Sequence, residues 1–494
     1  MSTNQKLNLR QINTGRLCAA LIAVYLFLVV AFYFLAGDQL HYRASPGELT
    51  LPTAEAGTVE LAQGALVEQT FSAKIQRLER ISVQWGTYYR PNTGTAVMEL
   101  YDAQSGELLS SQSFDVASIP EGGLTTLTFE PLLEGYYNVP LTLRVYADSP
   151  AGSAASPLMA YTIPEQKNSK SSADMETFHL LLNSTPVDGM LCFSVSGEDY
   201  IWTGLHYWEF AAVFGAVLAL YLFWVYRRWR AGRRSLLVNA VFALQKYRFL
   251  IKQLVDRDFK AKYKRSILGV FWSFLNPLLN MLVQYVVFSN MFKFNIPYFP
   301  VYLLCGNVVF NYFSEACGMS LTSIVGNAGL ITKVYVPKYI YPLTRIMSSM
   351  INLLISLIPL MAVALVSGLI PTKAYLLLPV PLLCLALFCL GLGMLLASAM
   401  VFFRDIQFLW GVLTTIWMYL TPIFYPIEAL PEAVQSVVER NPLYFFLAFV
   451  RTCILDGVSP EPRMYVQCAV IGLVTLGIGA FVFKKTQDKF VLYL

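Results

Sequence analysis

The sequence predicts an α-helical polytopic membrane protein of about eight transmembrane helices, with an extracytoplasmic all-β, sandwich-like domain between the first two. Of its 494 residues, 56% are hydrophobic and 14% are charged, whereas an average soluble domain carries about 25% charged residues. Eight apolar stretches are long enough to be transmembrane helices, which need about 20 residues each. Apolar and polar residues alternate in the segment between the first two stretches, as they do in β-strands. These observations exclude a disordered chain and a purely soluble protein.

The first apolar stretch, residues 17–36, is expected to remain in the protein as a membrane anchor. Lys6, Arg10 and Arg16 precede it, as basic residues precede a signal peptide. However, the stretch is longer than the apolar region of a typical signal peptide, and more spans follow it. The other spans are expected at residues 208–226, 267–292, 300–324, 346–370, 375–403, 408–425 and 465–483.

The distribution of Lys and Arg predicts the orientation of these spans, because cytoplasmic loops are enriched in both residues. Residues 227–265 hold 13 Lys and Arg against Asp256 and Asp258, whereas residues 37–205 hold 8 against 20 Asp and Glu. The first segment is therefore expected inside and the second outside, with both termini in the cytoplasm. The net charge of +5 then conceals a division across the membrane: inside segments hold 23 basic and 4 acidic residues, and outside segments hold 13 and 25.

The outside segment is long enough to form a domain with its own core. Apolar and polar residues largely alternate over residues 97–101 and 141–146, and turn-forming residues separate such runs at 91–94, 102–106 and 121–123. Residues 149–156 and 166–174 are expected to be loops. Short strands at this spacing favour an antiparallel sandwich. Cys192 is the only cysteine in the segment, so no internal disulfide is expected.

Aromatic residues of this domain have two interpretations. In the first, they pack in the core and across strands, and this interpretation is favoured. In the second, they bind a glycan together with acidic hydrogen-bond acceptors, which would make the segment a carbohydrate-binding domain. The aromatic residues concerned are Trp85, Tyr88, Tyr89, Tyr136 and Tyr137.

A basic segment follows the second span. Its first part, residues 227–234, is a cluster suited to anchoring at an anionic membrane surface, where each basic residue contributes about 1 kcal/mol. Its second part, residues 236–263, places Tyr247, Leu250, Ile251, Leu254 and Val255 at helical i, i+3 and i+4 spacing among basic residues. This pattern predicts an amphipathic helix at the cytoplasmic interface.

Four motifs follow in order after this helix. The first is the basic and aromatic run at residues 259–265, which leads into Ser266-x-x-Gly269-x-x-Trp272-x-x-x-Asn276-Pro277. The second is the segment at 327–338, the third is Phe403-Arg404-Asp405-Ile406, and the fourth combines residues 421–426 with Asn441-Pro442-Leu443. Together they resemble the ABC-2-type permeases that export polysaccharides, O-antigen and teichoic acids. The resemblance covers residues 236–494, and the first two spans and the outer domain depart from it as a fused accessory module.

The resemblance implies a bacterial cytoplasmic membrane protein in five parts. These are a cytoplasmic N-terminus with the first anchor at 1–36, the extracytoplasmic β-rich domain at 37–207, the second helix at 208–226, the basic cytoplasmic segment at 227–266, and a six-span ABC-2-type core at 267–494.

The resemblance also assigns roles to residues of this chain. ATPase coupling falls to Leu330, Lys333, Tyr335, Pro337 and Lys338. Substrate access at the interface falls to Arg257, Lys260, Tyr263, Lys264 and Arg265. The exit gate comprises Pro422, Phe424 and Tyr425. An ordinary positively charged loop is the alternative for the coupling segment.

Export against a gradient requires energy, and the sequence contains no G-x-x-x-x-G-K-[ST] motif for binding nucleotide phosphates. By resemblance, ATP and Mg²⁺ would bind in a separate ABC nucleotide-binding subunit, and this chain would need no cofactor of its own. The other expected partners are a second copy of the chain, membrane lipids and a lipid-linked polysaccharide. No nucleic acid is expected.

Polar and aromatic residues of the predicted spans are candidates for lining a glycan channel, since amides bind hydroxyl groups and aromatic faces stack on sugar rings. The candidates are Trp272, Asn276, Tyr285, Asn311, Tyr312, Trp417 and Tyr419. Helix packing is the alternative for Asn276, Asn280, Gln284, Asn290, Asn307 and Asn311. The small residues 391–393 and 397–399 permit close helix contact, and one interpretation is contact between two copies.

Glu209 and Glu315 are the only acidic candidates within the spans. Glu209 is expected at the interface. Glu315 is expected to face the path or to pair with Arg345 or Arg404. Two isolated acids are a poor proton relay, so a proton-driven carrier is disfavoured.

No catalytic constellation and no metal-ligand spacing is present in the sequence. Six of the eight Cys fall within predicted spans, and the three His are scattered. The expected function is that of a permease subunit which exports a lipid-linked polysaccharide or teichoic-acid-like polymer and lacks its own ATPase. Export of another amphiphile, a membrane-anchored glycan-binding or glycan-modifying protein, and a sensor remain as alternatives. The sensor is disfavoured, because the inside segments are too short for an output domain.

Overall fold

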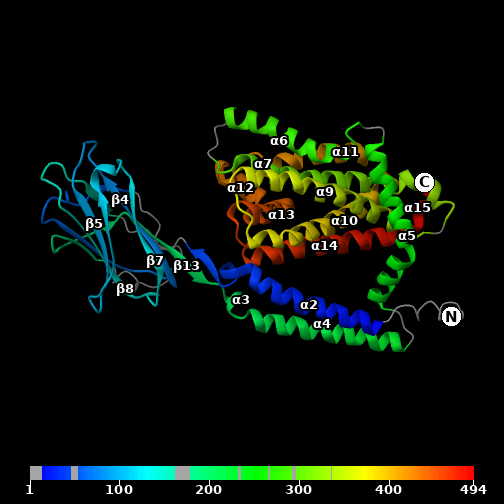
Figure 1. Ribbon diagram of the computed structural model, residues 1–494, viewed down its shortest axis with the longest axis horizontal. Helices are drawn as coiled ribbons and strands as arrows, with labels where there is room; N and C mark the ends of the chain where they lie inside the picture. Colours follow the sequence, from blue (N-terminus) through cyan, green and yellow to red (C-terminus); the bar gives the residue numbers. More distant parts are fainter. Residues whose placement is uncertain are drawn as a thin grey trace. The chain divides into compact units, whose positions relative to one another are not determined.

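The computed structural model describes residues 14–45, 54–161, 179–231, 235–264, 267–291, 296–334 and 336–493. The chain folds into two compact units (Figure 1). One is the β unit, His41–Leu205, and the other is the helical unit, which combines Met1–Leu40 with His206–Leu494. The predicted loop at 166–174 lies outside the described residues.

The β unit is a sandwich of two antiparallel sheets. One sheet has the order β1-β13-β4-β9-β12, with β2 beside β9 and β7 beside β4, and the other has the order β11-β10-β3-β8-β5-β6. The strands are β1 Tyr42–Ser45, β2 Ala56–Gly57, β3 Leu66–Ser72, β4 Arg77–Gly86, β5 Thr95–Asp102, β6 Leu108–Asp115, β7 Leu124–Glu134, β8 Pro140–Ala147, β9 Ser156–Ala160, β10 His179–Leu182, β11 Thr185–Val187, β12 Met190–Leu191 and β13 Phe193–Tyr200.

The predicted alternation at 97–101 and 141–146 is confirmed in β5 and β8, which pair with one another. Inward positions of both strands are buried and most outward positions are partly exposed, so the period of two in the sequence records the two faces of a sheet. Trp85, Phe71 and Phe193 are among the largest buried side chains of this core. Burial, with a smaller effect of Glu55, raises the pKa of the Cys192 thiol to about 11, which leaves it inert at neutral pH.

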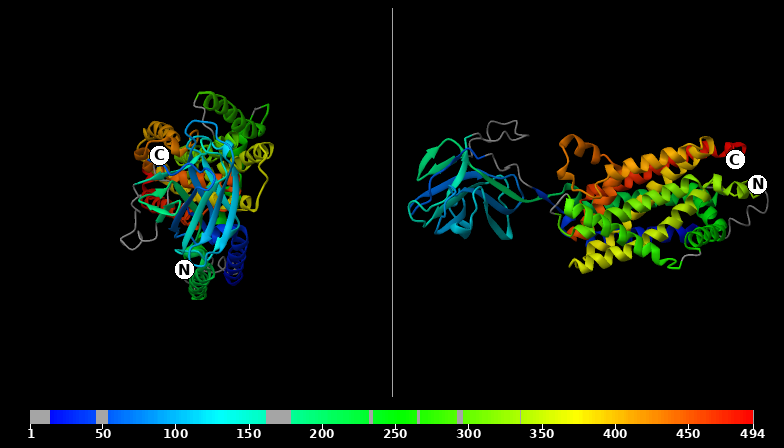
Figure 2. Two further views of the ribbon diagram at one scale, coloured as in Figure 1. Left: turned by 90° about the vertical axis from the view of Figure 1, so that its left-hand side faces the viewer. Right: turned by 90° about the horizontal axis from the view of Figure 1, so that it is seen from above.

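The helical unit is built from long helices, of which α6, α7, α9, α10 and α14 run side by side (Figures 1 and 2). The long helices are α2 Thr14–Ala36, α4 Tyr207–Arg230, α5 Leu236–Tyr263, α6 Phe271–Met291, α7 Phe299–Leu321, α9 Ile340–Val366, α10 Pro379–Phe402, α11 Ile406–Leu420 and α14 Pro462–Thr486. The short helices are α3 Trp202–Leu205, α8 Ala328–Ile331, α12 Glu432–Val438, α13 Pro442–Arg451 and α15 Phe490–Tyr493.

Six of the described helical segments are long and apolar enough to cross a membrane: Thr14–Leu40, Tyr207–Arg230, Phe271–Ser289, Ile340–Val366, Lys373–Phe402 and Pro462–Tyr493. The two other predicted spans differ from this description. Helix α7 has 23 residues, but it carries Asn307, Asn311 and Glu315 and is mostly buried by its neighbours. Helix α11 has 15 residues and extends about 22 Å, short of the hydrocarbon thickness of about 30 Å.

The prediction that the seventh span continues as a helix to residue 425 is wrong. Helix α11 ends at Leu420, because Thr421 precedes a proline and Pro422 cannot continue the helix. After this break the chain forms α12 and α13 before α14 begins. Helix α13 buries Leu443, Phe446 and Phe449 among the long helices, so the chain re-enters the bundle here, as the fourth motif led us to expect.

Helices α10 and α14 cross at backbone contact. A Cβ atom on Gly479 would lie 2.0 Å from the carbonyl oxygen of Gly391, and one on Gly391 would lie 2.3 Å from that of Thr475. Gly393 leaves room for the side chain of Ser320 of α7, whose hydroxyl oxygen would lie 2.4 Å from an added Cβ atom. The glycines therefore provide close contact within one chain, which corrects the suggestion that they join two copies.

Helices α2 and α4 pack against one another and expose apolar side chains outward. The hydroxyl group of Tyr25 donates to the carbonyl of Ala211 at 2.5 Å, and that of Tyr207 donates to the carbonyl of Val29 at 2.7 Å. Phe27 is 71% exposed. An apolar outer face with hydrogen bonds directed inward is what a lipid environment requires.

Helix α5 lies across one end of the bundle, at a steep angle to α9 and α10 (Figure 1). We call this end, which also holds α8 and α15, the α5 end, and we call the opposite end, which holds α12, the α12 end. The hydroxyl group of Ser235 caps α5 by accepting a hydrogen bond from the amide of Val238. The apolar stripe of α5 was predicted to lie at the membrane interface, but it packs against protein. Ile251, Leu254 and Val255 are buried in a cluster that includes residues of α8 and α9.

Candidate functional site

A polar groove runs between α6, α7 and α11. Its volume is about 550 Å³, and amide and hydroxyl groups make up much of its wall. The groove is lined by Asn280, Gln284, Asn307, Phe310, Asn311, Ser314, Gly318, Trp410, Gly411, Thr414, Thr415, Met418 and Ile423. The side chains of Gln284 and Asn307 hydrogen-bond to one another at 2.5 and 3.3 Å, which connects α6 to α7. Such a wall offers donors and acceptors to a hydroxylated chain.

Of the predicted lining residues, Asn311 alone is in this groove. Tyr312 is 3% exposed within the helix core, and the indole of Trp417 donates to Asn441 at 2.8 Å. Tyr285 and Tyr419 are exposed on the outer faces of α6 and α11. Trp272 is also exposed on α6, and Asn276 accepts a hydrogen bond from Asn280 at 3.1 Å.

The sequence predicted Trp417 and Tyr419 as the contribution of α11, but other residues of that helix line the groove. Thr414 and Thr415 line it, and each hydroxyl also donates to the carbonyl four residues earlier, at 2.8 and 3.1 Å. The sequence pattern of α7 could have shown its part of the groove, because Asn307, Asn311 and Gly318 lie on one face at helical spacing. Threonines on an otherwise apolar helix carry no comparable signal.

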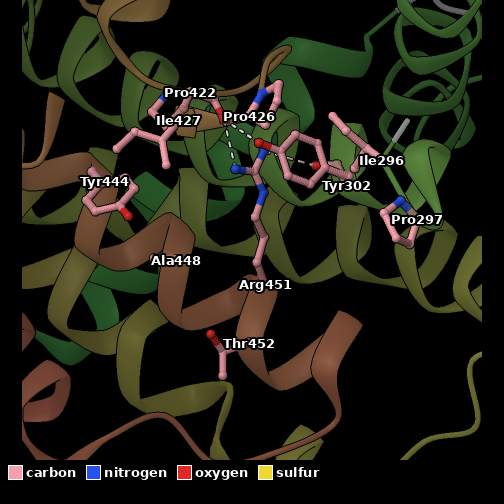
Figure 3. A pocket seen from close by; sticks show the side chains of 10 residues that line it. All are labelled: Ile296, Pro297, Tyr302, Pro422, Pro426, Ile427, Tyr444, Ala448, Arg451 and Thr452. Atoms are coloured by element: carbon pink, nitrogen blue, oxygen red, sulfur yellow. Dashed lines mark hydrogen bonds between the residues drawn. The ribbon is translucent and has the colours of Figure 1, made fainter. Parts of the chain in front are cut away.

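The predicted exit segment, residues 421–426, is a non-helical turn at the α12 end. The hydroxyl of Tyr302 donates to the carbonyl of Tyr425 at 2.8 Å, and the guanidinium of Arg451 donates to the carbonyl of Pro422 at 2.8 Å (Figure 3). Phe424 is 6% exposed and stacks on Phe288 with a ring separation of 5.1 Å. The turn is therefore held by backbone acceptors and one aromatic contact.

Asn441 joins the re-entrant helix to α11. Its carboxamide accepts from the Trp417 indole at 2.8 Å and from the amide of Leu443 at 3.1 Å, and it donates to the hydroxyl of Thr421 at 2.9 Å. Asn441 thus caps α13 and fixes the point where α11 ends.

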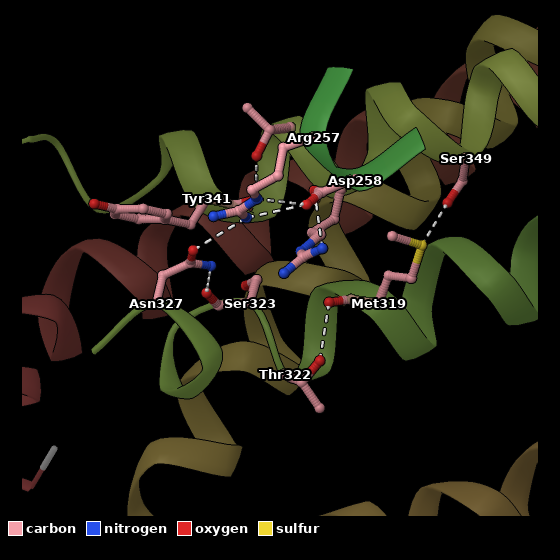
Figure 4. A network of polar contacts seen from close by, with 10 residues as sticks. Arg257, Asp258, Met319, Thr322, Ser323, Asn327, Tyr341 and Ser349 are labelled. Atoms are coloured by element: carbon pink, nitrogen blue, oxygen red, sulfur yellow. Dashed lines mark hydrogen bonds and ion pairs between the residues drawn. The ribbon is translucent and has the colours of Figure 1, made fainter. Parts of the chain in front are cut away.

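At the α5 end, a polar network joins α5 to α9 and to the loop before α8. Asp258 is 6% exposed and lies between two arginines: Arg257 at 3.0 Å and Arg345 at 2.8 Å (Figure 4). Arg257 also donates to the side chain of Asn327 at 3.2 Å, and Asn327 donates to the carbonyl of Ser323 at 2.7 Å. A predicted access residue, Arg257, is therefore a structural link to the segment predicted for coupling.

Glu315 is held by a second link from α5. Lys262 approaches both carboxylate oxygens at 2.9 Å, and the side chain of Asn352 donates to one of them at 2.6 Å. The predicted partners of Glu315 were wrong: Arg345 pairs with Asp258, and the cation on Glu315 comes from α5. Glu209 lies at the start of α4, 77% exposed, beside His206 at 3.2 Å, in agreement with an interfacial position.

The other predicted access and coupling residues fall into three groups. Lys260, Lys264 and Lys333 are exposed at the α5 end. Leu330 and Pro337 are partly buried, and Lys338 donates to the carbonyl of Gln487 at 2.5 Å and lies 5.8 Å from the ring centre of Phe490. Arg265, Tyr335 and the side chain of Tyr263 lie outside the described residues.

The predicted aromatic residues of the β unit divide into two sets. Trp85 is fully buried and donates to the Thr125 hydroxyl at 2.6 Å, and Tyr136 packs against the same core. Tyr88, Tyr89 and Tyr137 are 47%, 91% and 48% exposed. The packing interpretation therefore holds for the first set only.

Tyr88 and Tyr89 occupy an unusual loop. Both have positive φ, 56° and 52°, which is uncommon for residues other than glycine and costs about 1 kcal/mol each. The carboxylate of Glu121 accepts from the amide of Thr87 at 2.7 Å, the hydroxyl of Thr87 at 2.6 Å and the amide of Tyr89 at 3.3 Å. These contacts hold the pKa of Glu121 below its usual value, the Thr87 hydroxyl first among them.

Within the parts of the chain that the structure describes, no group of three or more His, Cys, Asp or Glu side chains is placed to hold a metal ion. The eight cysteines, all of them described, are free thiols, and seven are buried.

Comparison with known proteins identifies the family of a large part of the helical unit. Residues 249–455 match the ABC-2 type transporter family. The O-antigen export system permease protein RfbA of Myxococcus xanthus is 30% identical over 256 residues, which are 51% of this chain and 98% of that protein. A protein of the same name from Klebsiella pneumoniae is 26% identical over 49% of this chain and 93% of its own length, and the polysialic acid transport protein KpsM of Escherichia coli is 22% identical over 48% and 93%. The chain therefore belongs to the ABC-2 type transporter family, as its motifs led us to expect.

Proposed function

We propose that this chain is the permease subunit of an ATP-driven exporter that moves a lipid-linked polysaccharide or teichoic-acid-like polymer across the bacterial cytoplasmic membrane. The observation that carries the proposal is the groove of about 550 Å³ with amide and hydroxyl walls, in a helical bundle whose relatives are named as O-antigen and polysialic acid transporters. A glycan presents many hydroxyl groups, and a groove of this kind replaces the hydrogen bonds that those groups lose when they leave water.

We assign a second copy of the chain to the open side of the groove. Asn311 and Thr415 line it and are exposed in the single chain. An amide that faces lipid loses its hydrogen bonds, so these side chains need protein or water opposite them. Apolar side chains of α6 and α11, including Leu282, Val286 and Ile416, are more than half exposed and supply the surface that a second copy covers.

ATP hydrolysis is assigned to a separate nucleotide-binding subunit that carries the ATP and Mg²⁺. Its docking surface is the α5 end, where Lys260, Lys264 and Lys333 are exposed and where Leu330 to Lys338 form a short segment beside α5 and α15. This assignment places the α5 end and both termini in the cytoplasm, consistent with the excess of Lys and Arg in the inside segments.

Residues 37–207 are then extracytoplasmic, and the exposed Tyr88, Tyr89 and Tyr137 are proposed to contact the emerging glycan. Tyrosine rings on a rigid loop stack on sugar faces at low entropic cost. The isolated segment 38–205 should bind an envelope glycan on an array, and absence of binding to every envelope polymer would argue against this role.

The function is tested by reconstitution. The permease and its ATPase subunit are placed in proteoliposomes with a lipid-linked glycan, and outward movement of the glycan is measured with and without ATP. We expect movement only with ATP and both subunits. Movement of a fluorescent phospholipid without movement of the glycan would favour an exporter of another amphiphile, and would contradict the proposal.

A further inference from the structure

A partly buried guanidinium lies at the α12 end. Arg451 is the last residue of α13, and it donates to the carbonyl oxygens of Pro422 at 2.8 Å, Ile423 at 3.2 Å and Tyr302 at 3.3 Å. Its guanidinium carbon is 3.4 Å from the ring centre of Tyr302. Figure 3 shows the side chain extending from its helix toward Tyr302 and the turn at Pro422. One cation thus holds both the start of α7 and the exit segment.

No ion pair joins this guanidinium to an acid among the side chains that the structure describes, which do not include that of Glu428. Its electrostatic neighbours there are Tyr302, Cys305 and Tyr444. Its buried Nε–H has no acceptor in that set. A cation inside the helical bundle is costly unless an opposite charge meets it. Carbonyl dipoles compensate a full charge only in part, so an anion within reach of the guanidinium is favoured.

The space for an anion is adjacent. A cavity of about 430 Å³ beside Arg451 is lined by the side chains of Tyr444 and Thr452 and by apolar groups of Ile296, Pro297 and Ile427. Arginine binds phosphate oxygens through two parallel N–H donors, and such charge-assisted bonds are stronger than bonds to neutral carbonyls. A phosphoryl group in this cavity would therefore compete with Pro422 and Ile423 for the same donors.

We propose that this cavity binds the phosphoryl group of a lipid-linked substrate, with Arg451 as its cation. Binding moves the guanidinium from the carbonyls of Pro422 and Ile423 to the phosphate, and this releases the exit segment. The inference deepens the proposed export function and rests on it. In the absence of substrate, Arg451 keeps the exit turn closed.

The test uses the full-length protein in maltoside micelles, which contain no phosphate. Farnesyl diphosphate is the probe, farnesol is its uncharged counterpart, and phosphatidylglycerol represents an ordinary bilayer headgroup. We expect farnesyl diphosphate to bind and to speed amide hydrogen exchange at residues 423–425 at least fivefold, and farnesol to do neither. Phosphatidylglycerol that binds as tightly as farnesyl diphosphate would overturn the assignment to a carrier lipid.

Arg451→Gln should weaken binding of farnesyl diphosphate at least tenfold and speed exchange at 423–425 without ligand. Arg463→Gln changes an exposed arginine at the start of α14 and should leave both unchanged. Ala448→Phe fills the cavity without altering Arg451, so it should abolish binding and keep exchange slow, even if the Arg451 variant fails to fold. Equal binding by wild type and Ala448→Phe would overturn the site. Because binding is measured without the ATPase, its failure leaves the export assay intact as a separate test of the proposed function.

Discussion

At the scale of single residues, Asp258 shows how this protein accommodates a buried charge. Its side chain is 3% exposed, and Arg345 and Arg257 each approach one of its carboxylate oxygens. Two cations on one carboxylate leave a net positive charge in the network, and the carboxamide of Asn327 accepts one of the remaining donors. The side chain of Arg345 is 18% exposed, and its ion pair with Asp258 at 2.8 Å offsets the cost of desolvating the guanidinium. The acid is therefore what makes burial of Arg345 possible.

Replacement of this acid should be costly. We expect Asp258→Asn to lower the free energy of unfolding by about 3 kcal/mol, the lower end for breaking a buried ion pair, because Arg345 keeps its charge and loses its counterion. Denaturant titration of the purified protein in detergent measures this free energy. Adding Arg345→Gln to Asp258→Asn should restore part of the lost free energy of unfolding. A double variant that loses as much free energy as the two single variants together would mean that the pair is not coupled.

The hydrogen bonds of Glu121 predict that the stability of the β unit depends on pH. Its pKa is held low in the folded protein, so its stabilising contribution is present above the unfolded pKa of about 4.3 and is lost as the pH falls through the folded pKa. Because Glu121 is exposed, we expect Glu121→Gln to cost only about 1 kcal/mol at pH 7.

The melting temperature of the β unit, measured on the full-length protein, should therefore differ between wild type and Glu121→Gln at pH 7. The difference should shrink toward pH 3. Glu107→Gln, at another exposed acid of the same unit, serves as the control. A difference that persists unchanged at pH 3 would contradict the role of the carboxylate charge.

At the scale of elements, α5 is the helix that ties the proposed ATPase-facing surface to the bundle. Its apolar stripe packs with residues of α8 and α9, Arg257 reaches Asn327, and Lys262 reaches Glu315 in α7. A displacement of the loop before α8 would act on α5 and, through Lys262, on the half of α7 nearer the α5 end, which lines the groove. In the proposed exporter, these contacts form the mechanical route from ATP hydrolysis to the path.

Lys338→Glu combined with Tyr335→Ala should uncouple ATP hydrolysis from export. Lys338 donates a hydrogen bond to the backbone carbonyl of Gln487 and lies near Phe490 of α15. A glutamate at position 338 would lose both contacts and release α15 from the coupling segment. Export in proteoliposomes should fall at least tenfold while membrane insertion remains normal. Exposed Lys485→Glu on α14 provides a matched charge reversal away from this segment, and unchanged export in the double variant would refute the coupling assignment.

Local patterns in the sequence predicted the elements better than their contacts. The apolar spacing predicted the helix at residues 236–263, which is α5, and alternation predicted the strands β5 and β8. The partner of Glu315 lies 53 residues earlier in the chain. The partner of Gly391 lies on α14. No local pattern encodes such pairings, because they depend on how helices cross.

The sequence predicted a polar surface among the helices, but it did not predict which residues line the groove. Intramembrane amides pointed to a polar surface, and Asn311 is part of it. Trp417 and Tyr312 were assigned to the lining because aromatic rings suit glycans, but one bonds to the re-entrant helix and the other fills the core. Composition alone does not distinguish an aromatic residue that packs from one that lines a path.

At the scale of the whole molecule, the account rests on a helical unit of the ABC-2 type transporter family and a separate β unit. In the proposed orientation, the net charge of +5 is small because a basic inside and an acidic outside cancel. The proposed exporter places its basic surface toward an ATPase and anionic lipids, and its acidic sandwich outside. The central claim is that the glycan passes along the groove between α6, α7 and α11.

A steric block of the groove tests this claim most directly. Gly411 lines the groove, and a Cβ atom at this position would meet nothing within 4 Å, so Gly411→Trp adds bulk to the groove without a backbone clash. Gly477 on α14 is equally open but lies away from the groove, which makes Gly477→Trp the matched control. Export of the lipid-linked glycan in proteoliposomes with the ATPase subunit should fall at least tenfold in Gly411→Trp and stay near wild type in Gly477→Trp. Undiminished export by folded Gly411→Trp would contradict the claim that the groove is the path.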